Sequence, residues 1–124
     1  DEFTGLVRNA CAIAIASDNG NPQTTLAAIS IDDAYEVVPI ARRWRMDGVS
    51  ITRQTFNLSF DASLLPGADT LIVSDTPDFT GTLQFYQVKL VDNNGELTRA
   101  VALQLDDAAM PTRRYFTFGQ LQLK

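Results

Sequence analysis

The sequence predicts an all-β protein, an antiparallel β-sandwich or jelly-roll-like fold of about eight strands. Apolar and polar side chains alternate in several runs, most clearly in Leu97–Leu105, with the period of two that places one face of a strand in a core. Turn sequences rich in Gly, Pro, Asn and Asp separate these runs. No segment of helix length has the 3.6-residue apolar spacing of an amphipathic helix.

A single domain, residues 1–124, is expected because a chain of this length can bury one core without disulfides. The apolar fraction of 45% and the charged fraction of 20% are those of a globular protein. The longest apolar run, Ala10–Ala16, is too short to span a bilayer, so no membrane partner is expected. Since the chain begins at Asp1 rather than Met, we expect processing or trimming there.

The first half of the chain predicts strands separated by short turns. We expect residues 1–9 to form an extended arm or an edge strand. Ala10–Ala16 and Thr24–Ile31 flank a dense turn sequence, which predicts a first hairpin. Tyr35–Met46 predicts the next strand, in which Pro39 lacks an amide hydrogen and belongs at an edge or a bulge.

Asp47-Gly48 predicts a turn that leads into Val49–Phe60, whose apolar residues change phase halfway. A bulge near Arg53–Thr55, or a strand that crosses between two sheets, would produce this change. The later elements are expected to be a helical turn at Ala62–Leu65, a strand at Thr70–Ser74, loops at Asp75–Gly81 and Asp106–Thr112, and a final strand at Arg114–Leu123.

The strongest local signal is a hairpin over residues 82–105. Two apolar runs, Thr82–Val91 and Leu97–Leu105, flank the sequence Asp-Asn-Asn-Gly-Glu. Asn94-Gly95 supplies residues that tolerate positive φ at a tight turn. This signal indicates a fold class and no chemistry.

The chain contains no histidine and one cysteine, Cys11. These counts exclude a disulfide framework, the Ser-His-Asp and Cys-His catalytic arrangements, and the common zinc sites. Cys11 alternates with apolar residues and is expected to be a buried, inert thiol. We therefore expect no metal and no cofactor, and carboxylate, Lys or Tyr chemistry is what remains for an enzyme.

The basic residues are eight arginines and two lysines, although the net charge is −5. Protein interfaces are enriched in Arg and depleted in Lys, but biased codon usage would give the same ratio. The densest cluster is Arg42-Arg43-Trp44-Arg45, followed by Arg53. It indicates a solvated strand face, a protein–protein interface or, less readily because of the negative net charge, a nucleic-acid patch.

The C-terminal run Tyr115-Phe116-Thr117-Phe118 has large side chains on both faces of the predicted strand. A central strand buried on both sides is the simplest explanation. The alternative is a strand whose outer face meets a partner subunit, since monomers seldom expose large apolar patches. The candidate partner-binding residues are Arg43, Trp44, Arg45, Tyr115, Phe116 and Phe118.

Acidic residues gather in the turns at residues 18–21, 75–78 and 106–107. Calcium binds oxygen ligands in such loops, but none follows the 12-residue helix-flanked pattern, and Asp and Asn are ordinary turn residues. Glycoside hydrolysis would need two carboxyl groups that converge on one pocket. The turn position of most acids makes this arrangement the less expected one.

These observations favour a non-enzymatic β-sandwich that acts as a subunit or decoration protein of a larger particle, such as a virion capsid or tail or a pilus-like assembly. Its partners would be protein subunits, including further copies of the chain in a homo-oligomer, and its location a virion or the extracellular space. The alternative is a small carbohydrate- or ligand-binding module, with or without calcium, that uses Trp44 and tyrosines as stacking platforms. An enzyme is the third class.

Overall fold

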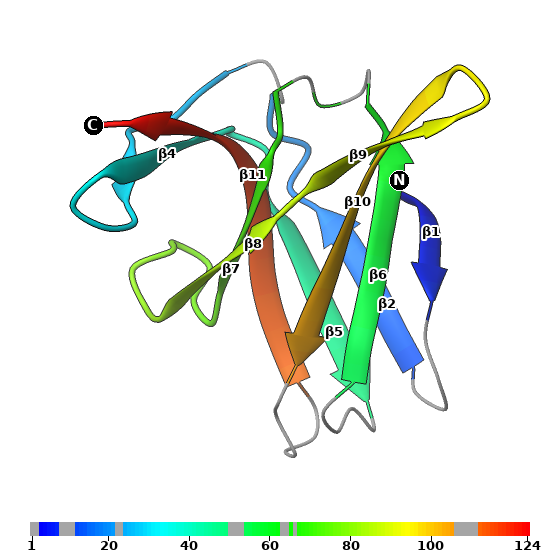
Figure 1. The fold of residues 1–124 in the computed structure, drawn as a ribbon. Helices are drawn as coiled ribbons and strands as arrows, with labels where there is room; N and C mark the ends of the chain where they lie inside the picture. The colour runs from blue at the N-terminus through cyan, green and yellow to red at the C-terminus, as the bar shows by residue number, and fades with distance from the viewer. Residues whose placement is uncertain are drawn as a thin grey trace.

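The computed structural model describes residues 3–7, 12–21, 24–49, 54–62, 65, 67–105 and 112–124. Within these ranges the protein is all-β and every strand pairing is antiparallel, as the sequence predicts (Figure 1). The strands of the described chain are β1 (Phe3–Val7), β2 (Ala12–Ser17), β3 (Ile29–Ser30), β4 (Tyr35–Pro39), β5 (Trp44–Val49), β6 (Gln54–Asp61), β7 (Thr70–Ser74), β8 (Leu83–Gln87), β9 (Lys89–Asn93), β10 (Glu96–Leu105) and β11 (Thr112–Leu123).

The strands form two sheets. Sheet A has the order β1-β6-β10-β9, and sheet B has the order β2-β5-β11-β4-β3 with β7 beside β11 and β8 beside β7. Side chains from both sheets join in one core: Phe60 and Val101 come from sheet A, and Trp44 and Phe118 come from sheet B. The rings of Phe60 and Phe118 meet with centroids 5.0 Å apart. Apolar side chains of both sheets therefore contribute to the same core.

β11 organises sheet B. One edge of this strand pairs first with β5 and then with β4, while β7 pairs with the opposite edge. Four residues, 40–43, lie between β4 and β5 and face only two residues of β11, and of these four the Ile40 amide still donates to the Phe118 carbonyl at 3.0 Å. The buried hydroxyl of Thr117 donates to the carbonyl of Arg42 at 2.7 Å and lies 3.4 Å from that of Ile40. This side chain satisfies backbone groups that the ladder leaves unpaired.

The predicted first hairpin is wrong. β2 pairs with β5, and the second strand shrinks to Ile29–Ser30, which pairs with β4. The predicted turn at Asp47-Gly48 is also wrong, because both residues lie within β5 and pair with β2 and β11. Turn-forming residues here sit inside a ladder whose partners are distant in sequence.

The hairpin over residues 82–105 is correct only in its second part. β9 and β10 pair as predicted, with Asn94 (φ 55°) and Gly95 (φ 94°) at the turn. β8 instead pairs with β7 in sheet B, and the chain changes sheet at Val88, whose amide donates to the carbonyl of Asp69. Figure 1 shows β8 and β9 following one another across the two sheets.

Other expectations agree with the structure. Phe3–Val7 forms an edge strand that pairs with β6 of the same chain. β5 lies in sheet B and β6 in sheet A, as the alternative of a strand that crosses between sheets predicts. Cys11 and the acidic pair at residues 106–107 lie outside the described residues, as do residue 53 of the predicted bulge near Arg53–Thr55 and residues 63–64 of the predicted helical turn at Ala62–Leu65.

Candidate partner-binding face

The register between β5 and β11 separates the predicted site residues into two groups. Phe116 pairs with Trp44, and Tyr115 pairs with Arg45. Because neighbouring residues of a strand point to opposite faces, the first pair faces the core and the second faces outward. The two faces of the same ladder therefore have different roles.

Trp44, Phe116 and Phe118 belong to the core and offer no surface to a partner. Their exposed fractions are 1%, 1% and 0%. The rings of Trp44 and Phe116 stack at 5.6 Å with an interplanar angle of 8°, and Phe118 meets Trp44 edge-on. Their own chain covers these three candidate side chains. A β11 buried on both faces, the simpler interpretation, agrees with the burial of residues 116–119.

Arg43, Arg45 and Tyr115 line a groove on the outer face of sheet B, here called the basic groove. Its volume is about 440 Å³. Arg45 is exposed and Tyr115 is half-buried. The basic groove is lined by Ser17, Asp18, Arg43, Trp44, Arg45, Pro77 and Tyr115.

Within the basic groove, Arg43 holds the loop of residues 75–81 against the sheet. Its Nη1 donates to the carbonyl of Pro77 at 3.0 Å, and its guanidinium lies 4.8 Å from the ring centroid of Phe79. Phe79 has a φ of 59°, a left-handed conformation that is rare for an aromatic residue. A cation–π contact and a hydrogen bond thus fix a strained loop. The Arg43 guanidinium therefore has a structural role, and Arg45 is the exposed arginine of the groove.

Arg42 contributes to packing. Its Nη2 donates to Ser17 Oγ at 2.9 Å, and its guanidinium lies over the Trp44 ring at 5.6 Å. Period-two alternation along a strand would place Arg42 and Trp44 on one face, and this contact agrees with that placement. Arg53 lies outside the described residues.

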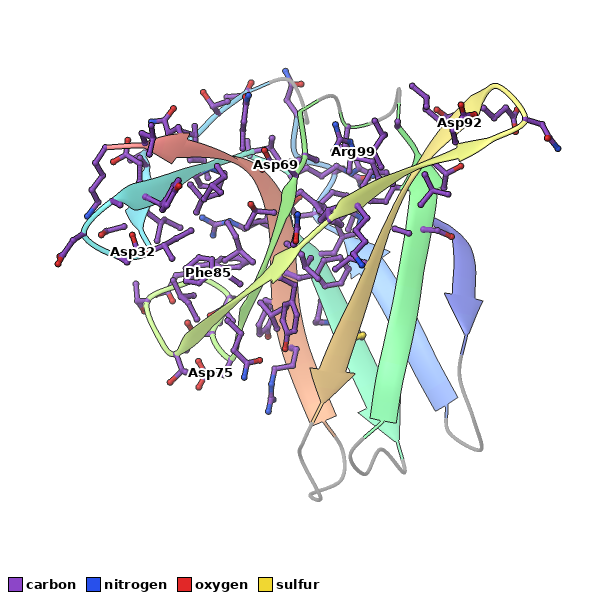
Figure 2. The ribbon with its side chains drawn as sticks, in the orientation of Figure 1. Asp32, Asp69, Asp75, Phe85, Asp92 and Arg99 are labelled. Atoms are coloured by element: carbon purple, nitrogen blue, oxygen red, sulfur yellow. The ribbon has the colours of Figure 1, made fainter. Side chains whose placement is uncertain are left out.

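Large apolar side chains are exposed at the end of the β9–β10 hairpin. Leu90, Val91 and Leu97 are 53%, 39% and 48% exposed. The acids Asp92 and Glu96 are also exposed; the register places Asp92 on one face of the hairpin with Leu90 and Leu97, and Glu96 on the other face with Val91. These five residues are here called the hairpin tip. Asp92 projects away from the sheets, on the other side of the molecule from Asp32 and Asp75 (Figure 2).

The carboxylates of the two described acidic loops are acceptors for their own backbone. Asp18 Oδ1 accepts from the amides of Gly20 and Arg43, and Asp75 Oδ1 from that of Thr82. Asp78 Oδ1 accepts from both the hydroxyl and the amide of Thr80. Among the described residues, no group of three or more acidic, His or Cys side chains is placed to hold a metal ion.

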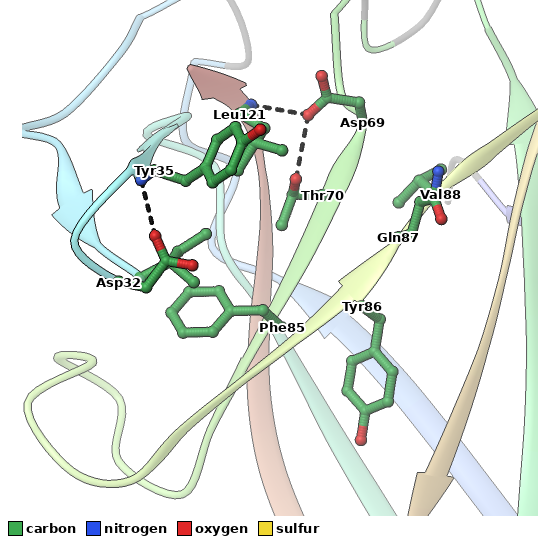
Figure 3. Close-up of a pocket in the computed structure, with 10 residues that line it drawn as sticks. Asp32, Tyr35, Asp69, Thr70, Phe85, Tyr86, Gln87, Val88 and Leu121 are labelled. Atoms are coloured by element: carbon green, nitrogen blue, oxygen red, sulfur yellow. Dashed lines mark hydrogen bonds between the residues drawn. The ribbon is translucent and has the colours of Figure 1, made fainter. Parts of the chain in front are cut away.

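The structure contains a further pocket that the sequence does not predict. It lies between β8 and the paired ends of β4 and β11, and Tyr35, Asp69 and Phe85 are among its lining residues (Figure 3). The sequence does suggest tyrosines as stacking platforms, but Trp44, named with them, is buried. The lining residues are spread from position 31 to position 121, so no local motif indicates the pocket.

No protein family, no curated protein and no solved structure matches this chain. Within the described ranges, the chain forms no helix of the length and apolar character needed to cross a membrane.

Proposed function

We propose that this protein is a non-enzymatic assembly protein, a β-sandwich subunit or decoration protein of a larger virion-like, pilus-like or extracellular particle. The observation that carries this proposal is the exposure of three large apolar side chains, Leu90, Val91 and Leu97, on one projecting hairpin. Exposed apolar patches on a hairpin favour contact with another protein, since burial removes their surface from water. The core shared by the two sheets supports the sandwich arrangement.

The partner that fits the hairpin tip is the basic groove of another copy. One face of the tip carries the carboxylate of Asp92 with Leu90 and Leu97, and the groove presents the exposed side chain of Arg45 next to Tyr115. Arg and Tyr are frequent anchors of interfaces, and opposite charges orient the two surfaces. Because the two surfaces differ, the contact is head-to-tail and propagates into rings or filaments.

Sedimentation velocity of the full chain over a concentration series, up to about 200 µM, tests this contact. We expect species larger than the monomer, and we expect Arg45→Glu and Leu97→Asp each to abolish them. Mixing the two variants should give a dimer that grows no further, because each supplies the intact surface that the other lacks. Leu123→Asp, a matched change at an exposed leucine outside both surfaces, should leave association unchanged.

A wild-type chain that stays monomeric throughout the series contradicts self-assembly. If the mixed variants do not form a dimer although both fold, the head-to-tail contact is wrong. Circular dichroism of each variant establishes folding, and Leu90→Asp, on the same face of the hairpin tip, supplies a second variant should Leu97→Asp not fold.

A further inference from the structure

The pocket between β8 and the β4–β11 ladder has the dimensions of a small-molecule site. Its volume is about 400 Å³, within the range of roughly 300–1,000 Å³ typical of ligand pockets. The pairings of β11 with β4 and β7, and of β7 with β8, place Tyr35, Leu121, Thr70 and Phe85 on one face of sheet B. The pocket is therefore built on paired strands, which fix its side chains.

The pocket has an aromatic and apolar wall that is open to solvent. Tyr35 is 41% exposed, Leu121 is 40% exposed, and Phe85 is half-buried. Figure 3 shows the Phe85 ring directed towards Asp32, while Tyr86 points to the opposite side of β8. Such rings provide a flat surface for the C–H groups of a ligand.

The carboxylates of Asp32 and Asp69 lie on different sides of this wall, and backbone amides donate hydrogen bonds to both (Figure 3). Asp32 Oδ1 accepts from the amides of Ala34 and Tyr35, each at 2.8 Å. Asp69 Oδ1 accepts from the Leu121 amide at 2.8 Å and from the Thr70 hydroxyl at 3.1 Å. Within the described chain, the second oxygen of each carboxylate has no hydrogen-bond donor, so it can accept one from a ligand.

We propose that this pocket binds a neutral saccharide, a ligand class separate from the assembly partner proposed above. The lining contains neither Lys nor Arg, and its polar groups are carboxylates, hydroxyls and the amide of Gln87. A ligand must therefore supply mainly donors, at more than one point of its edge, and a flat apolar face between them. A pyranose ring with its hydroxyl groups supplies both, whereas a compact ammonium ion would match one carboxylate.

The test is titration of the ¹⁵N-labelled full chain with glucose, galactose, mannose, N-acetylglucosamine, maltose and cellobiose, each to about 50 mM. For at least one sugar we expect saturable shifts of the amides of residues 85–88 and 121, with a Kd on the order of 1 mM. Tyr35→Ala should weaken this binding at least about tenfold. Tyr115→Ala, the same change in the basic groove, should leave sugar binding unchanged.

Asp69→Asn provides a second variant. Its amide oxygen can still accept from the Leu121 amide, but its amide nitrogen replaces the second carboxylate oxygen and donates instead of accepting. We therefore expect this variant to bind the sugar more weakly. The proposal is overturned if no sugar shifts these amides, or if choline chloride shifts them at lower concentration than every sugar. Cleavage of maltose or cellobiose would keep the site and overturn only the non-enzymatic function. Loss of self-association alone would leave the saccharide site intact.

Discussion

Thr117 is a buried polar residue at the most irregular point of sheet B. Its hydroxyl reaches the carbonyls of Arg42 and Ile40, where β4 and β5 separate. Thr117→Val keeps the shape of the side chain but leaves the Arg42 carbonyl without this donor. We expect the free energy of unfolding, measured in urea, to fall by about 1–3 kcal/mol.

Thr25→Val is the matched control, since this threonine is exposed. Its effect should stay within about 0.5 kcal/mol. Equal losses for the two variants would show that the Thr117 hydroxyl has no stabilising role beyond that of a surface threonine.

Asp78 offers a second prediction at the scale of single residues. Hydrogen bonds from the hydroxyl of Thr80, the hydroxyl of Thr76 and the amide of Thr80 lower the pKa of this exposed carboxyl. A pKa lowered by folding means that the ionised form stabilises the loop above the unfolded pKa, near 3.9, and that this contribution is lost as the pH falls through the folded pKa. The window therefore lies below about pH 4.

An NMR titration of the Asp78 carboxyl carbon measures this pKa. Thr80→Val should raise the pKa of Asp78 towards the ordinary aspartate value, because the largest cause of the shift is removed. Thr80→Ser retains a hydroxyl and should keep the low pKa. If Asp78 titrates identically in all three proteins, the hydrogen bond is not the cause.

The β9–β10 hairpin is the element whose formation depends most clearly on its turn. Gly95 has a φ of 94°, and its amide donates to Asp92 Oδ1 at 2.9 Å. A Cβ at position 95 would meet no atom within 4 Å, so Gly95→Ala costs only backbone strain. We expect a loss of about 1–2 kcal/mol in the free energy of unfolding, with faster amide exchange in β9.

Asn94→Gly is the comparison variant, because glycine adopts the φ of 55° at this position without strain. Its effect should be within about 0.5 kcal/mol of zero. A loss for Asn94→Gly as large as that for Gly95→Ala would rule out positive φ as the cause.

This hairpin also shows which elements the sequence predicts. Asn94-Gly95 signals the turn locally, and the two strands beside it are neighbours in sequence. In the sequence, β8 resembles a continuation of the hairpin. It pairs instead with β7, whose residues Thr70–Ser74 are all buried, and this pairing depends on tertiary packing rather than on local sequence. Asp47-Gly48 carries a strong turn signal that a three-strand ladder overrides.

The same division applies to the candidate sites. Alternation predicts that Arg43 and Arg45 share a face, and the basic groove contains both. Alternation does not tell which face of a strand its own chain covers, so it leaves the burial of Trp44, Phe116 and Phe118 open. The pocket beside Tyr35 depends on register between strands far apart in sequence, which no local pattern encodes.

At the scale of the whole molecule, one core joins the two sheets, so they should unfold together. Phe60 is fully buried and lies 5.0 Å from Phe118 of the other sheet, centroid to centroid. Phe60→Ala leaves a cavity between the sheets and should cost about 3–5 kcal/mol. The loss should appear as one cooperative transition, with hydrogen-exchange protection falling equally in β10 of sheet A and β7 of sheet B.

Leu123→Ala separates this effect from a general loss of apolar volume. Leu123 is 70% exposed at the end of β11, so its truncation should change the free energy of unfolding by less than about 0.5 kcal/mol. Two resolved transitions in Phe60→Ala, or reduced protection confined to β10, would mean that each sheet has a stability of its own. Equal protection losses instead mean that the rest of the shared core still couples the sheets when the Phe60 ring is removed, because no ladder joins the described strands of sheet A to those of sheet B.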